Sequence, residues 1–178
     1  MRVDLCTHCI VGVEYIASPN CDERPAENEI DLLVVHNISL PPNRFGGGYI
    51  QDFFQNKLDI SADPYFEEIK ELQVSSHLLI ERTGKLIQFV PFNKRAWHAG
   101  ESCFDGRQRC NDFSIGIELE GSDEIEYTDA QYRVLRAVIL CLQMTYPGLS
   151  GGNIVGHSDI APGRKTDPGS AFDWTRIA

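Results

Sequence analysis

Hydrophobic residues follow patterns typical of strands in several parts of the chain. Residues 32–35 are continuously apolar and end at His36, a pattern that favours a strand covered on both faces and therefore central in a sheet. Residues 74–91 form the clearest hairpin pattern, with two β-rich arms around a turn in which Gly84 supplies the conformation. A last short strand is predicted over 154–157. Two of the predicted strands thus end in a histidine.

Residues 113–119 alternate between apolar and small or polar residues. The odd-numbered positions are apolar, whereas Ser114, Gly116 and Glu118 face the other side of the predicted strand. Because Gly116 lacks a side chain, it leaves room above the sheet beside Glu118. A carboxylate on an inner strand needs a partner or a role, since an unpaired buried charge is costly. On an edge strand the same residue would be exposed, and the pattern alone leaves both interpretations open.

One long helix carries start and stop signals. Thr128 and Gln131 form a capping-box signature, and the Pro-Gly pair at 147–148 stops the helix. Between them lies one apolar stripe at helical spacing, made of Tyr132, Leu135, Ile139, Leu142 and Tyr146. Shorter helices or helical turns are predicted over 49–58 and 63–72.

The loops between these elements are long and rich in turn-forming residues. Residues 17–30 are polar, and 37–48 contain two prolines and three glycines, a length that is usually functional inside a compact domain. The glycines at 46–48 suit either a tight loop or a mobile lid. Strands, helices and loops together predict one α/β (α+β) domain over 1–178, with a mixed central β-sheet flanked by helices.

Composition narrows the class of protein. The chain has 178 residues, 42% of them hydrophobic and 24% charged, as in an ordinary globular domain. A net charge of −10 argues against nucleic acid as a general partner, because an acidic surface repels phosphates. No apolar stretch approaches the roughly 20 residues that a membrane-spanning helix needs, so no membrane partner is expected. The first residues make a poor signal peptide, and we expect a cytoplasmic protein and a monomer.

Six cysteines permit more than one interpretation. The even number invites disulfides, but the missing export signal and the chain length favour reduced structural thiols. Cys6 and Cys9 have the CxxC spacing of redox and zinc sites, and no second CxxC completes a four-cysteine site. A redox pair and an accessory metal site therefore remain the alternatives.

The strongest candidates for chemistry lie near the two predicted strands that end in histidine. His36 and His157 each open into a loop rich in glycine and proline, and Asp167 follows His157 by ten residues. Two imidazoles and a carboxylate, with a fourth position for water, are a known ligand set for catalytic zinc. Each residue alone has an ordinary structural explanation, and His77 and His98 compete for the ligand role. The residue pattern does not choose among these histidines.

Two further residues suit hydrolysis at such a metal. Glu118 could accept the proton of a metal-activated water. Lys165, two residues before Asp167, could stabilise the oxyanion formed when water attacks a carbonyl. A loop lysine on its own is most often merely solvated.

Several long segments, in one order, resemble the AmpD group of the type-2 N-acetylmuramoyl-L-alanine amidases. These segments are LLVVHNISLPP, HLLIERTGKLIQFVPFNKRAWHAG, RCNDFSIGIELEG, YTDAQY and GHSDIAPGRKTDPG. The resemblance runs from about Cys21 to Trp174 and leaves roughly residues 1–20 outside the clear match. It implies a mixed sheet flanked by helices, with zinc in a groove.

The resemblance also assigns roles by motif position. It implies that His36, His157 and Asp167 hold Zn²⁺, with Glu118 as the catalytic base and Lys165 as the group that stabilises the oxyanion. Substrate contacts are implied for three further residues, Asn37, Trp97 and Arg109. His77 and His98 are then left with structural or pocket-lining roles.

The implied reaction is hydrolysis of the amide between N-acetylmuramic acid, in its 1,6-anhydro form, and L-alanine of recycled muropeptides. Gln73 departs from the arginine expected in AmpD relatives. If that arginine binds the acidic end of the stem peptide, the affinity of this chain for the peptide is in question. Two other functions remain open: a non-catalytic muropeptide-binding protein and an amidase acting on intact peptidoglycan. The full set of candidate ligands and catalytic residues favours the enzyme over the binding protein.

Overall fold

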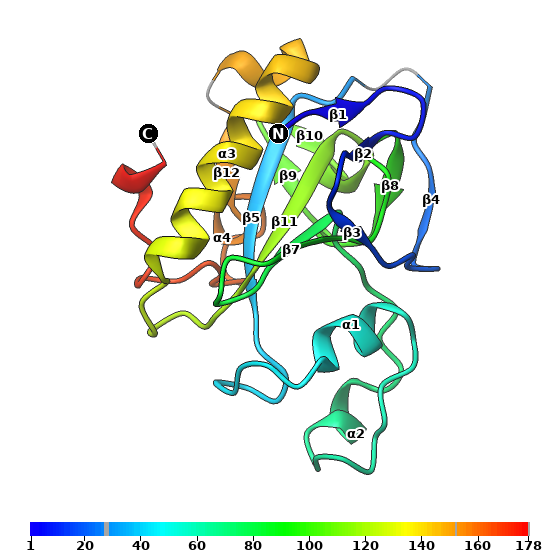
Figure 1. The fold of residues 1–178 in the computed structure, drawn as a ribbon, viewed down its shortest axis with the longest axis vertical. Coiled ribbons are helices and arrows are strands. Elements are labelled where there is room, and N and C mark those ends of the chain that lie inside the picture. Colours follow the sequence, from blue (N-terminus) through cyan, green and yellow to red (C-terminus); the bar gives the residue numbers. More distant parts are fainter. Residues whose placement is uncertain (27–28, 152, 178) are drawn as a thin grey trace.

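A computed structural model describes residues 1–26, 29–151 and 153–177, and its centre is a six-stranded sheet (Figure 1). The strand order is β12–β5–β11–β6–β7–β3. The strands are β3 (Glu14–Tyr15), β5 (Leu32–Ile38), β6 (Leu78–Ile80), β7 (Leu86–Gln88), β11 (Ser114–Glu120) and β12 (Ile154–Gly156). The β6–β7 pair is an antiparallel hairpin, and the other neighbours run parallel. The sheet is therefore mixed, and the predicted α/β fold is confirmed.

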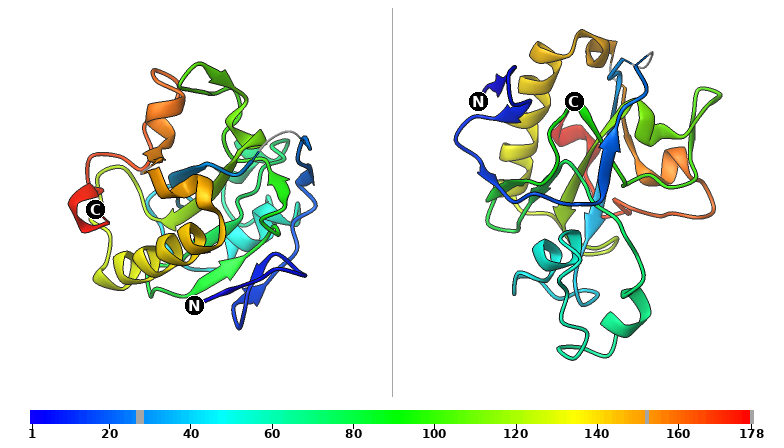
Figure 2. Two further views of the ribbon diagram at one scale, coloured as in Figure 1. Left: turned by 90° about the horizontal axis from the view of Figure 1, so that it is seen from above. Right: turned by 90° about the vertical axis from the view of Figure 1, so that its right-hand side faces the viewer.

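Helices and short strand pairs surround this sheet. The helical segments are α1 (Tyr49–Phe54), α2 (Phe66–Ile69), η1 (Cys110–Asp112), α3 (Asp129–Thr145), η2 (Pro147–Gly151), α4 (His157–Ile160) and η3 (Trp174–Arg176). The short pairs are β1 (Val3–Asp4) with β2 (Cys9–Ile10), β4 (Cys21–Glu23) with β8 (Lys94–Ala96), and β9 (Cys103–Phe104) with β10 (Arg107–Gln108). In Figures 1 and 2, α3 lies along one face of the sheet, and α1 and α2 lie beyond the carboxyl end of β5.

In the central strands β5 and β11, successive side chains point to opposite faces of the sheet, so the two faces carry different residues. Every residue of β11 is buried. On the α3 side, the core contains Leu33, Val35, Ile115, Ile117, Leu119, Leu135, Val138 and Leu142. The other side of β11 carries Ser114, Gly116 and Glu118, as the alternation predicts. The alternation thus gathers the polar side chains of β11 on the face opposite the α3 core, where they are buried and available to build a site.

The long helix begins and ends where its sequence signals predict. The Thr128 side chain accepts a hydrogen bond from the Gln131 backbone N–H at 3.1 Å, and the Gln131 side chain accepts one from the Thr128 N–H at 3.1 Å. The Gln131 amide also donates to the Ile80 carbonyl at 3.1 Å and the Glu120 carbonyl at 2.9 Å. The capping box therefore ties α3 to β6 and β11 as well as starting the helix.

The predicted loop 17–30 contains a strand that the hydrophobic pattern does not reveal, and residues 27–28 of that loop lie outside the described residues. β4 pairs with β8, and side chains of opposite charge face each other across the pair, with Asp22 beside Arg95 and Glu23 beside Lys94. Because cross-strand ion pairs take the place of apolar contacts, the strand has no apolar alternation.

Three other predicted boundaries differ from the structure. α1 and α2 are shorter than the predicted segments 49–58 and 63–72; after α1, Asn56 takes a left-handed backbone conformation that a helix cannot continue through. His157 is the first residue of α4 rather than the last of β12.

Two findings bear on the sequence expectations about membranes and cysteines. Within residues 1–26, 29–151 and 153–177, no helix is both long and apolar enough to cross a bilayer. The six cysteines, all inside these ranges, are free thiols.

Candidate metal and active site

Strand register brings the first candidate residues together. His36 in β5 lies directly opposite Glu118 in β11, and β12 places Gly156 beside Val35, so His157 follows next to His36. All three positions fall at the carboxyl ends of parallel strands, where sites form in sheets of this kind. Residues more than a hundred positions apart in the chain are therefore neighbours because of the sheet itself.

Asp167 reaches the same place through the loop after α4. The Ser158 N–H donates to the Asp167 carbonyl at 3.0 Å, and the Tyr127 hydroxyl donates to the Pro168 carbonyl at 2.8 Å. Gly156 lies against this loop, and a Cβ there would come within 2.7 Å of Pro168 Cδ. Close packing of the loop on the end of β12 thus sets the position of the carboxylate.

Three ligand atoms converge at this point. The Nδ1 atoms of His36 and His157 are 3.0 Å apart, and Asp167 Oδ2 lies 3.0 Å from the first and 3.1 Å from the second. Ligands at about 2.0–2.1 Å from a tetrahedral zinc are separated by roughly 3.3 Å, so the triangle has the size of one face of such a site. Within the described residues, these three side chains form the group able to hold a metal ion.

The hydrogen bonds of the two histidines indicate that the three converging atoms carry no proton between them, an arrangement that suits a bound cation. His157 Nε2 lies 3.1 Å from the Ala99 carbonyl, which only accepts, and 3.5 Å from Arg164 Nη2, which donates to that same carbonyl at 2.7 Å. The shorter contact puts the ring proton on Nε2 and leaves Nδ1 bare. Burial lowers the pKa of His36 to about 4 against the opposing effect of Asp167, so this ring is neutral at pH 7. Two lone pairs and a carboxylate oxygen then point at one spot, an arrangement that a cation bound between them would stabilise.

Glu118 lies beside the three candidate ligands as a buried carboxylate. Its side chain is 9% exposed, and Oε2 has no hydrogen-bond partner among the described residues. Burial, and next the charge of Asp167, raise the pKa of Glu118 well above its ordinary value, while Lys165 acts in the opposite direction. Because β11 is an inner strand, the alternative of an exposed edge-strand glutamate is excluded.

A groove of about 360 Å³ opens over this group. Its polar floor includes His36, Asn37, His98, Glu118, His157, Lys165 and Asp167, and its apolar wall includes Leu40, Phe53, Phe54, Tyr65, Ile69 and Leu72. The wall comes largely from α1, α2 and the loops around them, a contribution that sequence reasoning did not assign. Its signal was the aromatic and aliphatic content of 49–72, which suits a core as well as a groove.

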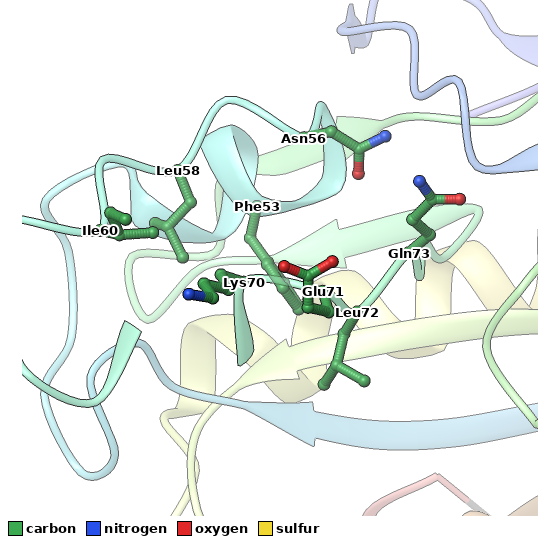
Figure 3. A pocket seen from close by; sticks show the side chains of 8 residues that line it. All are labelled: Phe53, Asn56, Leu58, Ile60, Lys70, Glu71, Leu72 and Gln73. Carbon is green, nitrogen blue, oxygen red and sulfur yellow. The ribbon is translucent and has the colours of Figure 1, made fainter. Parts of the chain in front are cut away.

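Gln73 lines a smaller cavity next to this groove. That cavity, about 110 Å³, shares Phe53 and Leu72 with the groove and is otherwise lined by Asn56, Lys70, Glu71 and other residues of the same segment (Figure 3). The Lys70 ammonium is paired with Glu67. Gln73, which stands where an arginine is expected, thus lies close to the groove and follows the segment that forms its apolar wall.

The implied substrate-contacting residues lie in different places. Asn37 lines the groove and donates to Asp123 Oδ1 at 2.8 Å. Trp97 and Arg109 are not among the described residues that line it, and Arg109 is exposed with an ion pair to Asp112 at 3.4 Å. Substrate contacts of Trp97 and Arg109 stay predictions.

The fold and the three-ligand group define an α/β domain with a candidate catalytic metal centre. Residues 26–170 match the N-acetylmuramoyl-L-alanine amidase family. The chain therefore belongs to that family, and the expectation of an amidase of this family is confirmed.

Individual relatives agree with this assignment. The 1,6-anhydro-N-acetylmuramyl-L-alanine amidase AmpD of Haemophilus influenzae is 57% identical over 167 residues, which are 94% of this chain and 91% of the relative. A crystal structure of an AmpD derivative superposes with a TM-score of 0.95 at 52% identity, covering 99% of this chain and 97% of that one. The Escherichia coli amidase AmiD, solved with the substrate anhydro-N-acetylmuramic acid-L-Ala-D-γ-Glu-L-Lys, gives a TM-score of 0.60 at 28% identity, covering 89% of this chain and 64% of that one.

Proposed function

We propose that this chain is a zinc-dependent amidase that hydrolyses the bond between 1,6-anhydro-N-acetylmuramic acid and L-alanine in muropeptides. The observation that carries the proposal is the convergence of His36, His157 and Asp167 beside the unpartnered carboxylate of Glu118. The anhydro-sugar preference rests on the similarity to AmpD, and AmiD supports it as a relative bound to an anhydro-muropeptide. The cytoplasm is the proposed location, on the resemblance to the AmpD group.

Zinc is the proposed metal because of the donor set. Two imidazole nitrogens and one carboxylate oxygen, with a further position left for water or substrate, are typical of catalytic zinc. Zinc bound there supplies a Lewis acid that polarises a carbonyl and lowers the pKa of a water molecule. His36, His157 and Asp167 are the residues that would hold it.

The remaining steps fall to Glu118 and Lys165. The Glu118 carboxylate takes a proton from the attacking water while the oxygen of that water bonds to the lactyl carbonyl carbon. The same carboxyl group then delivers that proton to the alanine nitrogen as the C–N bond breaks, so its charge is restored at the end of the cycle. Lys165 lines the groove and places an ammonium near the negative charge that develops on the carbonyl oxygen.

Two measurements test the proposal. Metal analysis of the purified protein should give about one zinc per chain, and chelation followed by zinc addition should remove and restore turnover. Purified anhydro-muropeptide and intact peptidoglycan should then be digested in parallel, with products separated by chromatography and identified by mass. Release of peptide from the anhydro-muropeptide far faster than from intact wall is expected. Faster cleavage of intact wall would overturn the substrate assignment, and binding without cleavage would overturn the enzyme.

A further inference from the structure

A chain of hydrogen bonds runs from the backbone to the side of His36 that faces away from the ligand cluster. The Ser114 hydroxyl lies 2.6 Å from the Cys110 carbonyl and 3.2 Å from His98 Nε2. At the other edge of the same ring, His98 Nδ1 lies 2.9 Å from His36 Nε2. Each of these side chains is buried.

The chemistry of the groups fixes where each proton lies. A carbonyl only accepts, so the single hydroxyl proton of Ser114 goes to Cys110. The Ser114 oxygen must then accept from His98, whose one ring proton therefore sits on Nε2 and leaves Nδ1 as an acceptor. It follows that His36 carries its own proton on Nε2 and donates it to His98. His36 Nδ1 is left bare, and this is the atom at the point where the three ligand atoms converge.

Two other residues hold His98 in this position. Gly116 makes room for the ring, because a Cβ there would lie 2.5 Å from His98 Cγ and 2.7 Å from His98 Nδ1. Asn111 Oδ1 accepts the backbone N–H groups of His98 at 3.1 Å and of Ala99 at 2.8 Å. One amide oxygen thus anchors both the ring that faces His36 and the carbonyl that accepts from His157.

We propose that His98, oriented by Ser114, is a positioning residue that fixes His36 in the tautomer whose Nδ1 can bind a metal. The inference rests on the proposed role of His36 as a zinc ligand. Through this chain of hydrogen bonds, the Cys110 carbonyl determines that the His36 ring proton lies on Nε2. The lone pair of His36 Nδ1 is therefore oriented toward the metal position before a metal binds. Hydrogen-bond partners of this kind typically change metal affinity by about 10–100-fold when they are lost.

The tautomers can be read directly in the metal-free wild-type protein. Long-range ¹H–¹⁵N correlation spectra of ¹⁵N-histidine-labelled protein at pH 7 distinguish protonated from bare ring nitrogens. Protons on Nε2 and bare Nδ1 atoms are expected for His36 and His98. A proton on Nδ1 of either ring would overturn the inference, whatever the zinc affinity or activity of the protein.

A matched pair of variants tests the consequence for metal binding. Ser114→Ala removes the group that sets the His98 proton, and zinc affinity, measured by competition with a chromophoric chelator, should fall by about 10–100-fold. Ser76→Ala is the control, since Ser76 is equally buried and its hydroxyl has no hydrogen-bond partner within the described residues. The control should keep wild-type affinity.

The outcomes separate this inference from the proposed function. Failure of the wild type to bind zinc would remove the proposed metal centre, while the tautomer spectrum would still report on the hydrogen-bond chain. Tight zinc binding by wild type and Ser114→Ala alike would overturn the positioning role and leave the proposed amidase intact. A redistribution of the His98 or His36 proton in the Ser114→Ala spectrum is the signature that a merely structural serine would not produce.

Discussion

Replacing Glu118 with glutamine should separate catalysis from stability. The substitution keeps the shape of the side chain, removes its charge and replaces one carboxylate oxygen with an amide that cannot take a proton. General acid–base groups contribute about 10²–10⁴-fold to rate, so kcat should fall by that factor, equivalent to roughly 2.7–5.4 kcal/mol in the barrier. Zinc should remain bound, because Glu118 is not one of the three ligands that converge.

The same substitution should stabilise the metal-free protein. Glu118 is 9% exposed, with an oxygen that lacks a partner among the described residues, and its pKa is raised mainly by burial. A carboxyl group whose pKa is higher in the folded than in the unfolded protein lowers stability as pH rises above its unfolded value of about 4.3. Glutamine removes this penalty, so the gain should be absent below about pH 4 and grow toward neutral pH.

The assay combines turnover with unfolding. Peptide release is followed by chromatography, zinc is measured in the same samples, and urea unfolding is recorded in chelator at pH 4 and pH 7.5. Glu124→Gln, at an exposed position, is the control and should leave activity and stability near wild type. Near-normal turnover of the zinc-loaded Glu118→Gln protein would refute the base assignment. A variant less stable than wild type at pH 7.5 would refute the argument from an unpartnered buried charge.

Four other substitutions have defined expected results. Lys165→Ala should reduce kcat by about 10²–10³-fold in steady-state kinetics with a smaller change in KM; the reverse pattern would make it a binding residue. Asp167→Ala should lose stoichiometric zinc in chelator competition, and retention of the metal would contradict its role as a ligand. Thr128→Ala should cost about 1–2 kcal/mol in urea unfolding, since it removes the cap of α3. Arg24→Met should cost more than about 3 kcal/mol in the same measurement, because it leaves carbonyls of Phe92, Asn111, Asp112 and Ser114 without their donor; a loss below about 1 kcal/mol would contradict this.

The parts of the fold that the sequence predicts are those governed by local rules. The alternation over 113–119 identified which side of β11 packs into the apolar core. The glycine-containing turn at 82–85 lies in the β6–β7 hairpin, where the Gly84 N–H donates to the Glu81 carbonyl. Thr128 and Gln131 located the start of α3. In each case the deciding interaction joins residues a few positions apart, so the pattern carries the information.

The assembly of the candidate site depends on distant pairings that local patterns do not encode. Glu118 lies beside His36 because β5 and β11 align in parallel over seven residue pairs. A shift of that register by one residue would turn the glutamate to the opposite face. The position of Asp167 depends on loop packing against Gly156 and Tyr127. Resemblance to a family supplied these relations where residue patterns could not.

The histidines that sequence could not rank are separated by what each ring nitrogen faces. His77 Nδ1 accepts the Gly116 N–H at 3.1 Å, and its Nε2 lies 3.1 Å from the Lys94 carbonyl, so this ring has no lone pair left for a metal. His98 uses its own lone pair on His36. His36 and His157 each direct Nε2 toward a hydrogen-bond partner, which leaves Nδ1 available to bind a metal. In these rings the nitrogen available to a metal is the one that no neighbouring donor or acceptor occupies, and tertiary contacts decide which nitrogen that is.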